Sequence, residues 1–289
     1  MLRNTNPKNI CEIIKLGEDL LRKYSLTSKL DSELLLSFVL KKRREFLYSS
    51  FEKNISRKQY LSFLKLIEKR KNKYPIAYIL GEKDFYGNLF KVSRGTLIPR
   101  PETEQLIDIT INKIAKYFKN NNNIRILEIG SGSGCIPITL KTLLKQRALV
   151  YSFEISKNAF VQAKKNYKMI KPGRITFKNS DAFKTIYPQK KFDIIISNPP
   201  YLTKSDMGKI GKEVSFEPKL ALDGGLDGLL YFRKLSELLN SQLKKKGFAI
   251  FEINEHLGEN TAAIFKNEYN CQIIKDLFNK DRFILISRQ

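Results

Sequence analysis

The stretch Arg125-Ile126-Leu127-Glu128-Ile129-Gly130-Ser131-Gly132-Ser133-Gly134 joins a short apolar run to a glycine-rich loop. The run predicts a buried strand, and the residues after the loop predict a helix. The three glycines allow a sharp turn and the close approach of a ligand. No Gly-Lys-Ser/Thr follows, and the spacing is not GxGxxG, so neither a P-loop nor a dinucleotide site is favoured. A ligand-binding turn is one interpretation, and a plain tight turn is the other.

Strand and helix patterns alternate after this loop. The sequence predicts further strands at residues 149–153, 175–177, 192–196 and 248–253, with helical patterns between them. Such alternation is typical of a doubly wound, mostly parallel sheet. Two last apolar runs, at 271–274 and 283–287, flank a turn and should pair antiparallel at the edge of the sheet. Together with residues 125–129, these runs predict an α/β fold with seven strands.

Acidic residues lie at the ends of three successive predicted strands. Glu128 lies beside the glycine loop, where a carboxylate suits an ammonium ligand. Glu154 comes about twenty residues later, where a carboxylate can accept both hydrogens of a ribose diol. Asp181, followed by Ala182 and Phe183, suits the amine and the face of an adenine. Each acid alone could be a solvated loop residue, but the three together point to S-adenosylmethionine.

The tetrapeptide Asn198-Pro199-Pro200-Tyr201 directly follows the strand at 192–196 and should lie at the same sheet edge. Prolines lack N–H groups and have a fixed φ, which leaves rigid carbonyls free to accept hydrogen bonds. The Asn198 side-chain oxygen and the Pro199 carbonyl can bind both hydrogens of a planar NH₂ group, and Tyr201 can stack on it. The alternative is a proline-rich loop that caps a strand. The residue types favour methyl transfer to an amide or aryl amine nitrogen.

The N-terminal part differs from the rest. Apolar residues at helical spacing predict a small helical bundle over residues 1–74. Residues 75–100 predict a β-hairpin linker, with β-like pieces at 77–80, 84–86 and 89–92 and a turn near Gly87-Asn88. Residues 101–289 then form the predicted catalytic domain.

Composition excludes several classes of site. The chain has 289 residues, 53 Lys or Arg against 29 Asp or Glu, one histidine and three cysteines. A single histidine and scattered cysteines predict no metal site and no disulfide framework, and they fit a reduced, cytoplasmic setting. No apolar run reaches the roughly 18 residues of a membrane helix. The net charge of +24 could reflect a nucleic-acid partner, an acidic partner or a compositional bias.

With both motifs in place, the sequence resembles the protein-(glutamine-N5) methyltransferases, which modify the Gly-Gly-Gln glutamine of peptide-chain release factors. The most specific segment is Ile98-Pro99-Arg100-Pro101-Glu102-Thr103-Glu104, whereas the Asn-Pro-Pro-Tyr motif is shared with nucleic-acid amino-methyltransferases. Similar segments cover residues 74–81, 84–87, 97–104, 197–201, 216–222, 224–229, 275–277 and 281–282. The resemblance implies a class I S-adenosylmethionine-dependent methyltransferase fold, preceded by a helical substrate-docking domain.

The resemblance also implies roles for particular residues. Those expected at the cofactor are Glu128, Gly130, Ser131, Gly132, Ser133, Gly134, Glu154, Asp181, Ala182, Phe183, Asn198, Arg100 and Thr103. Asn198, Pro199, Pro200 and Tyr201 are expected to hold the substrate glutamine. Two departures stand out: Glu154 replaces a more usual aspartate, and Glu252-Ile253-Asn254 replaces a more usual Glu-Ile-Gly. The only histidine, His256, falls in the loop after Asn254 and is expected to be a surface residue.

Other functions remain as alternatives. A nucleic-acid adenine-N6 or guanine-N2 methyltransferase could use the same tetrapeptide, but no target-recognition domain or RNA-binding motif is visible. A cofactor-binding scaffold without catalysis is the third interpretation. We expect a monomer that binds release factors without binding nucleic acid directly. Residues 1–73 carry +10 of the net charge, concentrated at 41–44 and 69–71, which suggests a basic surface that steers an acidic face of the release factor.

Overall fold

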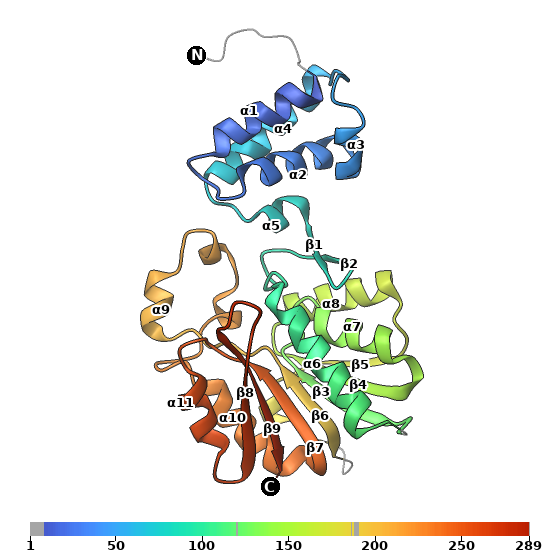
Figure 1. Cartoon of the computed structure of the whole chain (residues 1–289), viewed down its shortest axis with the longest axis vertical. Coiled ribbons are helices and arrows are strands. Elements are labelled where there is room, and N and C mark those ends of the chain that lie inside the picture. Colours follow the sequence, from blue (N-terminus) through green and yellow to red (C-terminus); the bar gives the residue numbers. More distant parts are fainter. Residues whose placement is uncertain (1–8, 120, 186, 188–190, 289) are drawn as a thin grey trace. The chain divides into compact units, whose positions relative to one another are not determined.

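The computed structural model describes residues 9–119, 121–185, 187 and 191–288. Two compact units divide the chain. The helical unit contains residues 1–81 and a returning segment at 211–216, and the sheet unit contains residues 82–210 and 217–289 (Figure 1). The predicted linker at 75–100 is therefore shared between the two units. In the part of the chain described here, no helix is both long and apolar enough to cross a membrane.

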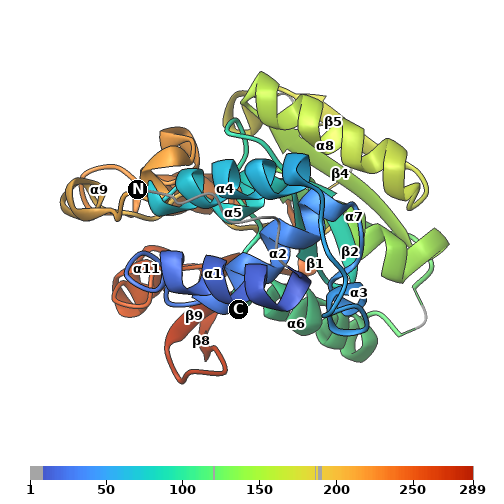
Figure 2. The same ribbon diagram turned by 90° about the horizontal axis from the view of Figure 1, so that it is seen from above.

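The described residues of the helical unit form the α-helices α1 (Ile10–Leu21), α2 (Ser28–Leu40), α3 (Arg44–Tyr48), α4 (Arg57–Lys71) and α5 (Ile76–Leu80). Their apolar faces meet in a core that includes Ile13, Leu35 and Phe63, all fully buried. The Asn9 side chain caps α1, and Ser56 with Gln59 forms a capping box at α4. Figure 2 shows α1, α2 and α4 of this packed group from above.

The structure corrects the prediction for residues 77–80, which were expected to be β-like and instead lie in α5. Pro75 precedes the helix with φ −56°, and Gly81 ends it in the left-handed region at φ 73°. Five residues are too few to show a helical period, so the sequence pattern was ambiguous. The hairpin prediction is confirmed by β1 (Glu82–Phe85) and β2 (Asn88–Lys91).

Arg70 is a core residue of the helical unit. Its side chain is 7% exposed and pairs with Asp31 at 2.6 Å and with Glu213 of the returning segment at 2.8 Å. Tyr74 and Phe216 pack edge to face, with ring centroids 5.0 Å apart. Arg70 therefore belongs to the internal structure rather than to the basic surface expected around residues 69–71.

The sheet unit contains a seven-stranded sheet in the order β5-β4-β3-β6-β7-β9-β8 (Figure 1). All neighbouring pairs are parallel except those involving β9, which is antiparallel to β7 and to β8. The predicted fold class, with its antiparallel edge, is confirmed. The strands are β3 (Ile124–Ile129), β4 (Ala148–Glu154), β5 (Ile175–Asn179), β6 (Phe192–Ser197), β7 (Leu243–Glu252), β8 (Tyr269–Lys275) and β9 (Asp281–Arg288).

Helices cover both faces of this sheet. Alternate strand residues point to opposite sides, so Ile126 and Ile194 enter one core, while Leu127 and Ile195 enter the other. The helices around the first core are α6 (Glu102–Tyr117), α7 (Cys135–Leu144) and α8 (Lys157–Ile170), and those around the second are α10 (Leu230–Gln242) and α11 (Gly258–Phe265). The short helix α9 (Lys204–Lys209) follows β6. Three layers result, with strands β3, β6 and β7 buried on both faces.

Candidate active site

A pocket lies where β3, β4 and β6 end. Parallel pairing aligns these strand ends, since Ile129 is registered with both Phe153 and Ser197. The loops that follow the three strands therefore meet at one sheet edge, the usual ligand position in such folds. The lining comes from residues 95, 97–100, 103, 129–133, 135–136, 153–156, 159, 180–183, 197–200, 218, 220–221, 231 and 234–235.

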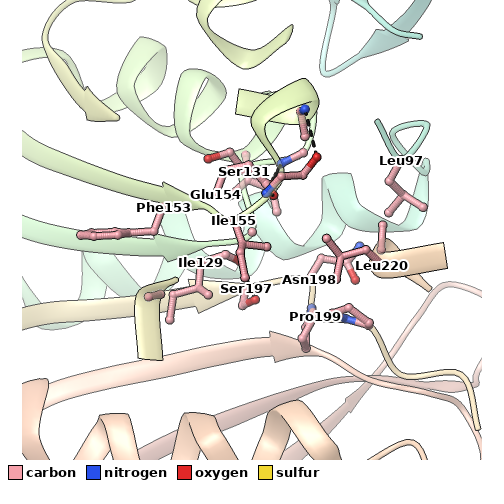
Figure 3. Close-up of a pocket in the computed structure, with 18 of the residues that line it drawn as sticks. Leu97, Ile129, Ser131, Phe153, Glu154, Ile155, Ser197, Asn198, Pro199 and Leu220 are labelled. Carbon is pink, nitrogen blue, oxygen red and sulfur yellow. Dashed lines mark hydrogen bonds between the residues drawn. The ribbon is translucent and has the colours of Figure 1, made fainter. Parts of the chain in front are cut away.

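The glycine loop forms one wall of this pocket (Figure 3). Gly130 and Gly132 have φ values of 82° and 54°, which side-chain-bearing residues rarely adopt. The Gly130 N–H donates to the Phe153 carbonyl at 2.8 Å, which ties the loop to β4. This backbone leads into the N-terminus of α7, so the prediction of a loop between a strand and a helix is confirmed.

Glu154 is 7% exposed and bridges the glycine loop to the start of α8. Its Oε2 accepts from the Gly132 N–H, and its Oε1 accepts from the Ser156 N–H, both at 2.8 Å. Burial raises the pKa of this carboxyl, and the backbone donors oppose that shift. Each oxygen retains a second lone pair, so the carboxylate can accept from a diol while keeping its backbone bonds.

Asp181, Ala182 and Phe183 form another wall. Asp181 caps a single 3₁₀ turn, because its Oδ1 accepts from the Phe183 N–H at 2.9 Å. Tyr231 of α10 lies beside Phe183, with ring centroids 6.3 Å apart. The Lys234 ammonium lies 5.6 Å from the centre of the Phe183 ring. Tyr231 and Lys234 were not predicted, because the sequence of α10 shows only an amphipathic helix.

Glu128 lies beneath the pocket rather than in its lining. It is fully buried, and its Oε2 accepts from the Ser152 Oγ at 2.5 Å. The Ser152 Oγ also lies 2.5 Å from the Ser131 Oγ, and Ser131 does line the pocket. Burial raises the pKa of the Glu128 carboxyl to about 8. Glu128 was predicted to contact an ammonium ligand directly. In the structure it is connected to the pocket only through the hydroxyls of Ser152 and Ser131.

The tetrapeptide divides into two parts. Asn198, Pro199 and Pro200 line the pocket, whereas Tyr201 lies outside its lining and donates from its hydroxyl to Glu252 Oε1 at 3.1 Å. Figure 3 shows Asn198 and Pro199 close to Leu220, with Phe153 at the far side of the view. Burial raises the pKa of the Tyr201 phenol, and the nearby Glu252 carboxyl adds to this shift. The phenol therefore stays protonated.

Two buried side chains, Thr103 and Glu252, form a hydrogen-bonded chain with the Asn198 amide. Its Nδ2 donates to the Thr103 Oγ1 at 3.2 Å, and the Thr103 hydroxyl donates to Glu252 Oε2 at 2.7 Å. Thr103 and Glu252 are 2% and 1% exposed. Sequence reasoning placed Thr103 at the cofactor and did not assign Glu252 to the site. Only the fold brings together residues separated by 149 positions.

Arg100 is fixed by a buried carboxylate. Its Nη2 pairs with Glu217 Oε1 at 2.5 Å, while Glu217 Oε2 accepts from the Ile98 N–H at 3.0 Å. Arg100 lines the pocket as expected, and the pair ties the segment at 97–100 to Pro218 and Leu220. His256, by contrast, has an 83% exposed side chain, so its prediction as a surface residue is confirmed.

Two family models match the chain: the PrmC N-terminal domain over residues 12–81 and the methyltransferase small domain over residues 103–225. The chain is 35% identical over 257 residues to a release factor glutamine methyltransferase of Bacillus anthracis, covering 87% of this chain and 90% of that protein. It is 36% identical over 293 residues to the enzyme of the same name from Leptospira interrogans, covering 98% and 99%.

Among solved structures, the catalytic domain of hMettl16 in complex with the MAT2A 3′UTR hairpin 1 is similar, with a TM-score of 0.56. The match covers 87% of this chain and 90% of that chain at 13% sequence identity. This structural similarity supports the methyltransferase fold, but at such low sequence identity it says nothing about the substrate.

The buried Glu128 predicts a pH-dependent stability. Because its folded pKa of about 8 exceeds the ordinary value of 4.5, the folded state retains a proton that the unfolded state releases between these values. The free energy of unfolding should therefore fall as pH rises, by up to about 1.4 kcal/mol per pH unit. Urea unfolding of the cofactor-free protein at pH 5.5 and 7.5 measures this slope.

Glu128→Gln should reduce that dependence, because an amide does not titrate in this range, while the raised pKa values of Glu154 and Glu252 maintain the remainder. The matched control is Glu259→Gln, since Glu259 is exposed and should leave the slope unchanged. An identical slope in Glu128→Gln and in the unmodified protein would contradict the assignment.

Proposed function

Because the chain belongs to the release factor glutamine methyltransferase family, we propose that it methylates the side-chain amide nitrogen of a release-factor glutamine. The methyl donor is S-adenosylmethionine, and the acceptor is the glutamine of the Gly-Gly-Gln motif. The observation that carries the proposal is the Asn198 amide in the pocket, with its Nδ2 engaged by Thr103 and its Oδ1 left to accept. The activity belongs to translation termination in the cytoplasm.

The pocket residues fit the proposed cofactor. Glu154 offers acceptors for a ribose diol next to exposed glycine backbone, and Asp181 with Phe183 offers an acceptor and a ring for adenine. When bound, S-adenosylmethionine supplies an electrophilic methyl group on a sulfonium. We assign Gly130 and Gly132 to its methionine part, because glycine lets the backbone approach closely there.

The proposed site promotes methyl transfer by orienting the substrate amide. An amide nitrogen is a poor nucleophile because its lone pair is delocalised into the carbonyl. Asn198 Oδ1 and the Pro199 carbonyl bind its two hydrogens, which fixes the plane of the NH₂ group and stabilises the positive charge that develops on nitrogen. Positioning of this kind is worth effective molarities of about 10⁵ M and above. The proton leaves to water after the methyl group is transferred, so the exposed His256 is not needed.

The basic surface of the helical unit is the proposed docking site. Lys41, Lys42, Arg43 and Arg44 are exposed at the turn between α2 and α3. Their charge would attract an acidic face of the release factor and raise the rate of encounter. Arg70 takes no part because it is buried among carboxylates.

The direct test is methyl transfer from labelled S-adenosylmethionine to a purified release factor. Asn198→Ala should lower kcat by about 10² to 10³, the loss typical when one preorganised polar group is removed from a reacting centre. Cofactor affinity, measured by calorimetry, should change by less than about threefold. The control is Asn123→Ala at an exposed position. Label in RNA or DNA without label in the protein would exclude this function, and full activity of Asn198→Ala would exclude the acceptor role.

Glu154→Gln should weaken cofactor binding by roughly tenfold or more, because an amide places an NH₂ group against one of two backbone N–H donors. Calorimetric titration with S-adenosylmethionine measures the change, and Glu259→Gln is the control at an exposed site. Unchanged affinity would remove Glu154 from the cofactor site.

Lys42→Gln with Arg43→Gln should lower kcat/KM about two- to fivefold at low salt, with kcat unchanged. The difference should shrink towards physiological ionic strength, because salt screens exposed charges. Lys165→Gln with Lys168→Gln removes the same charge from α8, where both residues are exposed, and is the control. Equal losses in the two double variants would show that only total charge matters.

A further inference from the structure

The hydrogen bonds of the Asn198 side chain lead through Thr103 to a buried carboxylate, Glu252. Glu252 ends β7 and is 1% exposed, and no part of it lines the pocket. Its two oxygens accept from two hydroxyls: Oε2 from Thr103 at 2.7 Å and Oε1 from Tyr201 at 3.1 Å. The three residues come from β7, α6 and the loop after β6, so the carboxylate joins three elements around the pocket.

The donor and the acceptor in each hydrogen bond between Glu252, Thr103 and Asn198 follow from the number of hydrogens that each group carries. A threonine hydroxyl has one hydrogen, and Thr103 donates it to Glu252. Only the lone pairs of Thr103 Oγ1 then remain for Asn198, so the amide must present its NH₂ group to Thr103. The carbonyl oxygen of the amide is left for another donor. With the opposite polarity, the NH₂ group of Asn198 would face the NH₂ group of a substrate amide.

We propose that Glu252 is a positioning residue that acts through Thr103 to fix the orientation of the Asn198 amide, so that Oδ1 accepts from the substrate nitrogen. This inference rests on the proposed function, because it assumes that the acceptor nitrogen carries hydrogens directed at Asn198. Glu252 itself lies outside the pocket lining and touches neither substrate nor cofactor.

Burial raises the pKa of the Glu252 carboxyl, and the charge of Glu102 adds to this shift. The hydroxyls of Thr103 and Tyr201 and the positive charge of Arg282 oppose it. Arg282 is itself held by Asp276 at 3.0 Å. The acceptor role rests on the geometry, in which the Thr103 and Tyr201 hydroxyls each donate to a different oxygen of Glu252.

A double-mutant cycle tests the path. Thr103→Val keeps the branched shape but removes the hydroxyl, and should lower kcat by about 10² without changing cofactor affinity. Thr103→Ser restores the hydroxyl and should recover kcat to within a few-fold.

Glu252→Gln should lower kcat by about tenfold or more, because one acceptor oxygen must then serve two hydroxyls. In the Thr103→Val background, Glu252→Gln should cause no further loss of kcat. Additive losses would overturn the inference.

The control for a purely structural loss is Asp193→Asn. Asp193 is also a buried carboxylate of the sheet unit, and it accepts from the Arg125 N–H and pairs with Lys244. It lies at the start of β6, whereas the pocket lies at the end of that strand. Asp193→Asn should lower the unfolding midpoint and leave kcat unchanged. A matching loss of kcat in Asp193→Asn would show that kcat follows stability and would overturn the inference.

A second measurement separates this inference from the proposed function. The side-chain amide protons of Asn198, assigned in NMR spectra by their loss in Asn198→Ala, report the bond to Thr103 without any substrate. Their shifts and exchange protection should change in Thr103→Val and in Glu252→Gln and persist in Thr103→Ser. Unchanged signals in the first two variants would overturn the inference. Failure of the unmodified protein to methylate a release factor would instead overturn the proposed function.

Discussion

The parallel register of β3, β4 and β6 is the constraint on which the site depends. Ile129 lies opposite Phe153 on one side and Ser197 on the other, so three strands end at one level. One functional segment follows each strand: the glycine turn follows β3, the segment that begins at Glu154 lies at the end of β4, and the tetrapeptide from Asn198 follows β6. A slip in register would displace a loop and would also turn buried strand residues towards the wrong core.

The two sides of the pocket are built differently. The glycine side relies on backbone conformation, since Gly130 and Gly132 occupy left-handed φ values and Glu154 bonds to backbone N–H groups. The tetrapeptide side relies on a chain of side chains, from Asn198 through Thr103 to Glu252. An unpaired polar group is costly in a buried network, and the buried Thr103 and Glu252 side chains both have hydrogen-bond partners here.

Sequence reasoning succeeded where a residue type has a narrow conformational or chemical use. The alternating pattern predicted the parallel sheet, the apolar runs at its end predicted the antiparallel edge, and the glycines marked the turn after β3. It failed at residues 77–80, where four apolar residues fit a strand or a helix equally well. It also counted Arg70 with the surface charges, because its partners Asp31 and Glu213 are distant in the chain.

The sequence alone determined the fold class, the strand-end positions of Glu154 and Asp181, and the tetrapeptide, because these depend on local patterns and spacing. Tertiary structure decided what each group does there. It buried Glu128 below the pocket, turned Tyr201 towards Glu252, and placed Thr103 between Glu252 and Asn198. Hydrogen bonds between residues about 50 to 150 positions apart leave no periodic signal in the sequence, since they depend on how layers pack rather than on neighbouring residues.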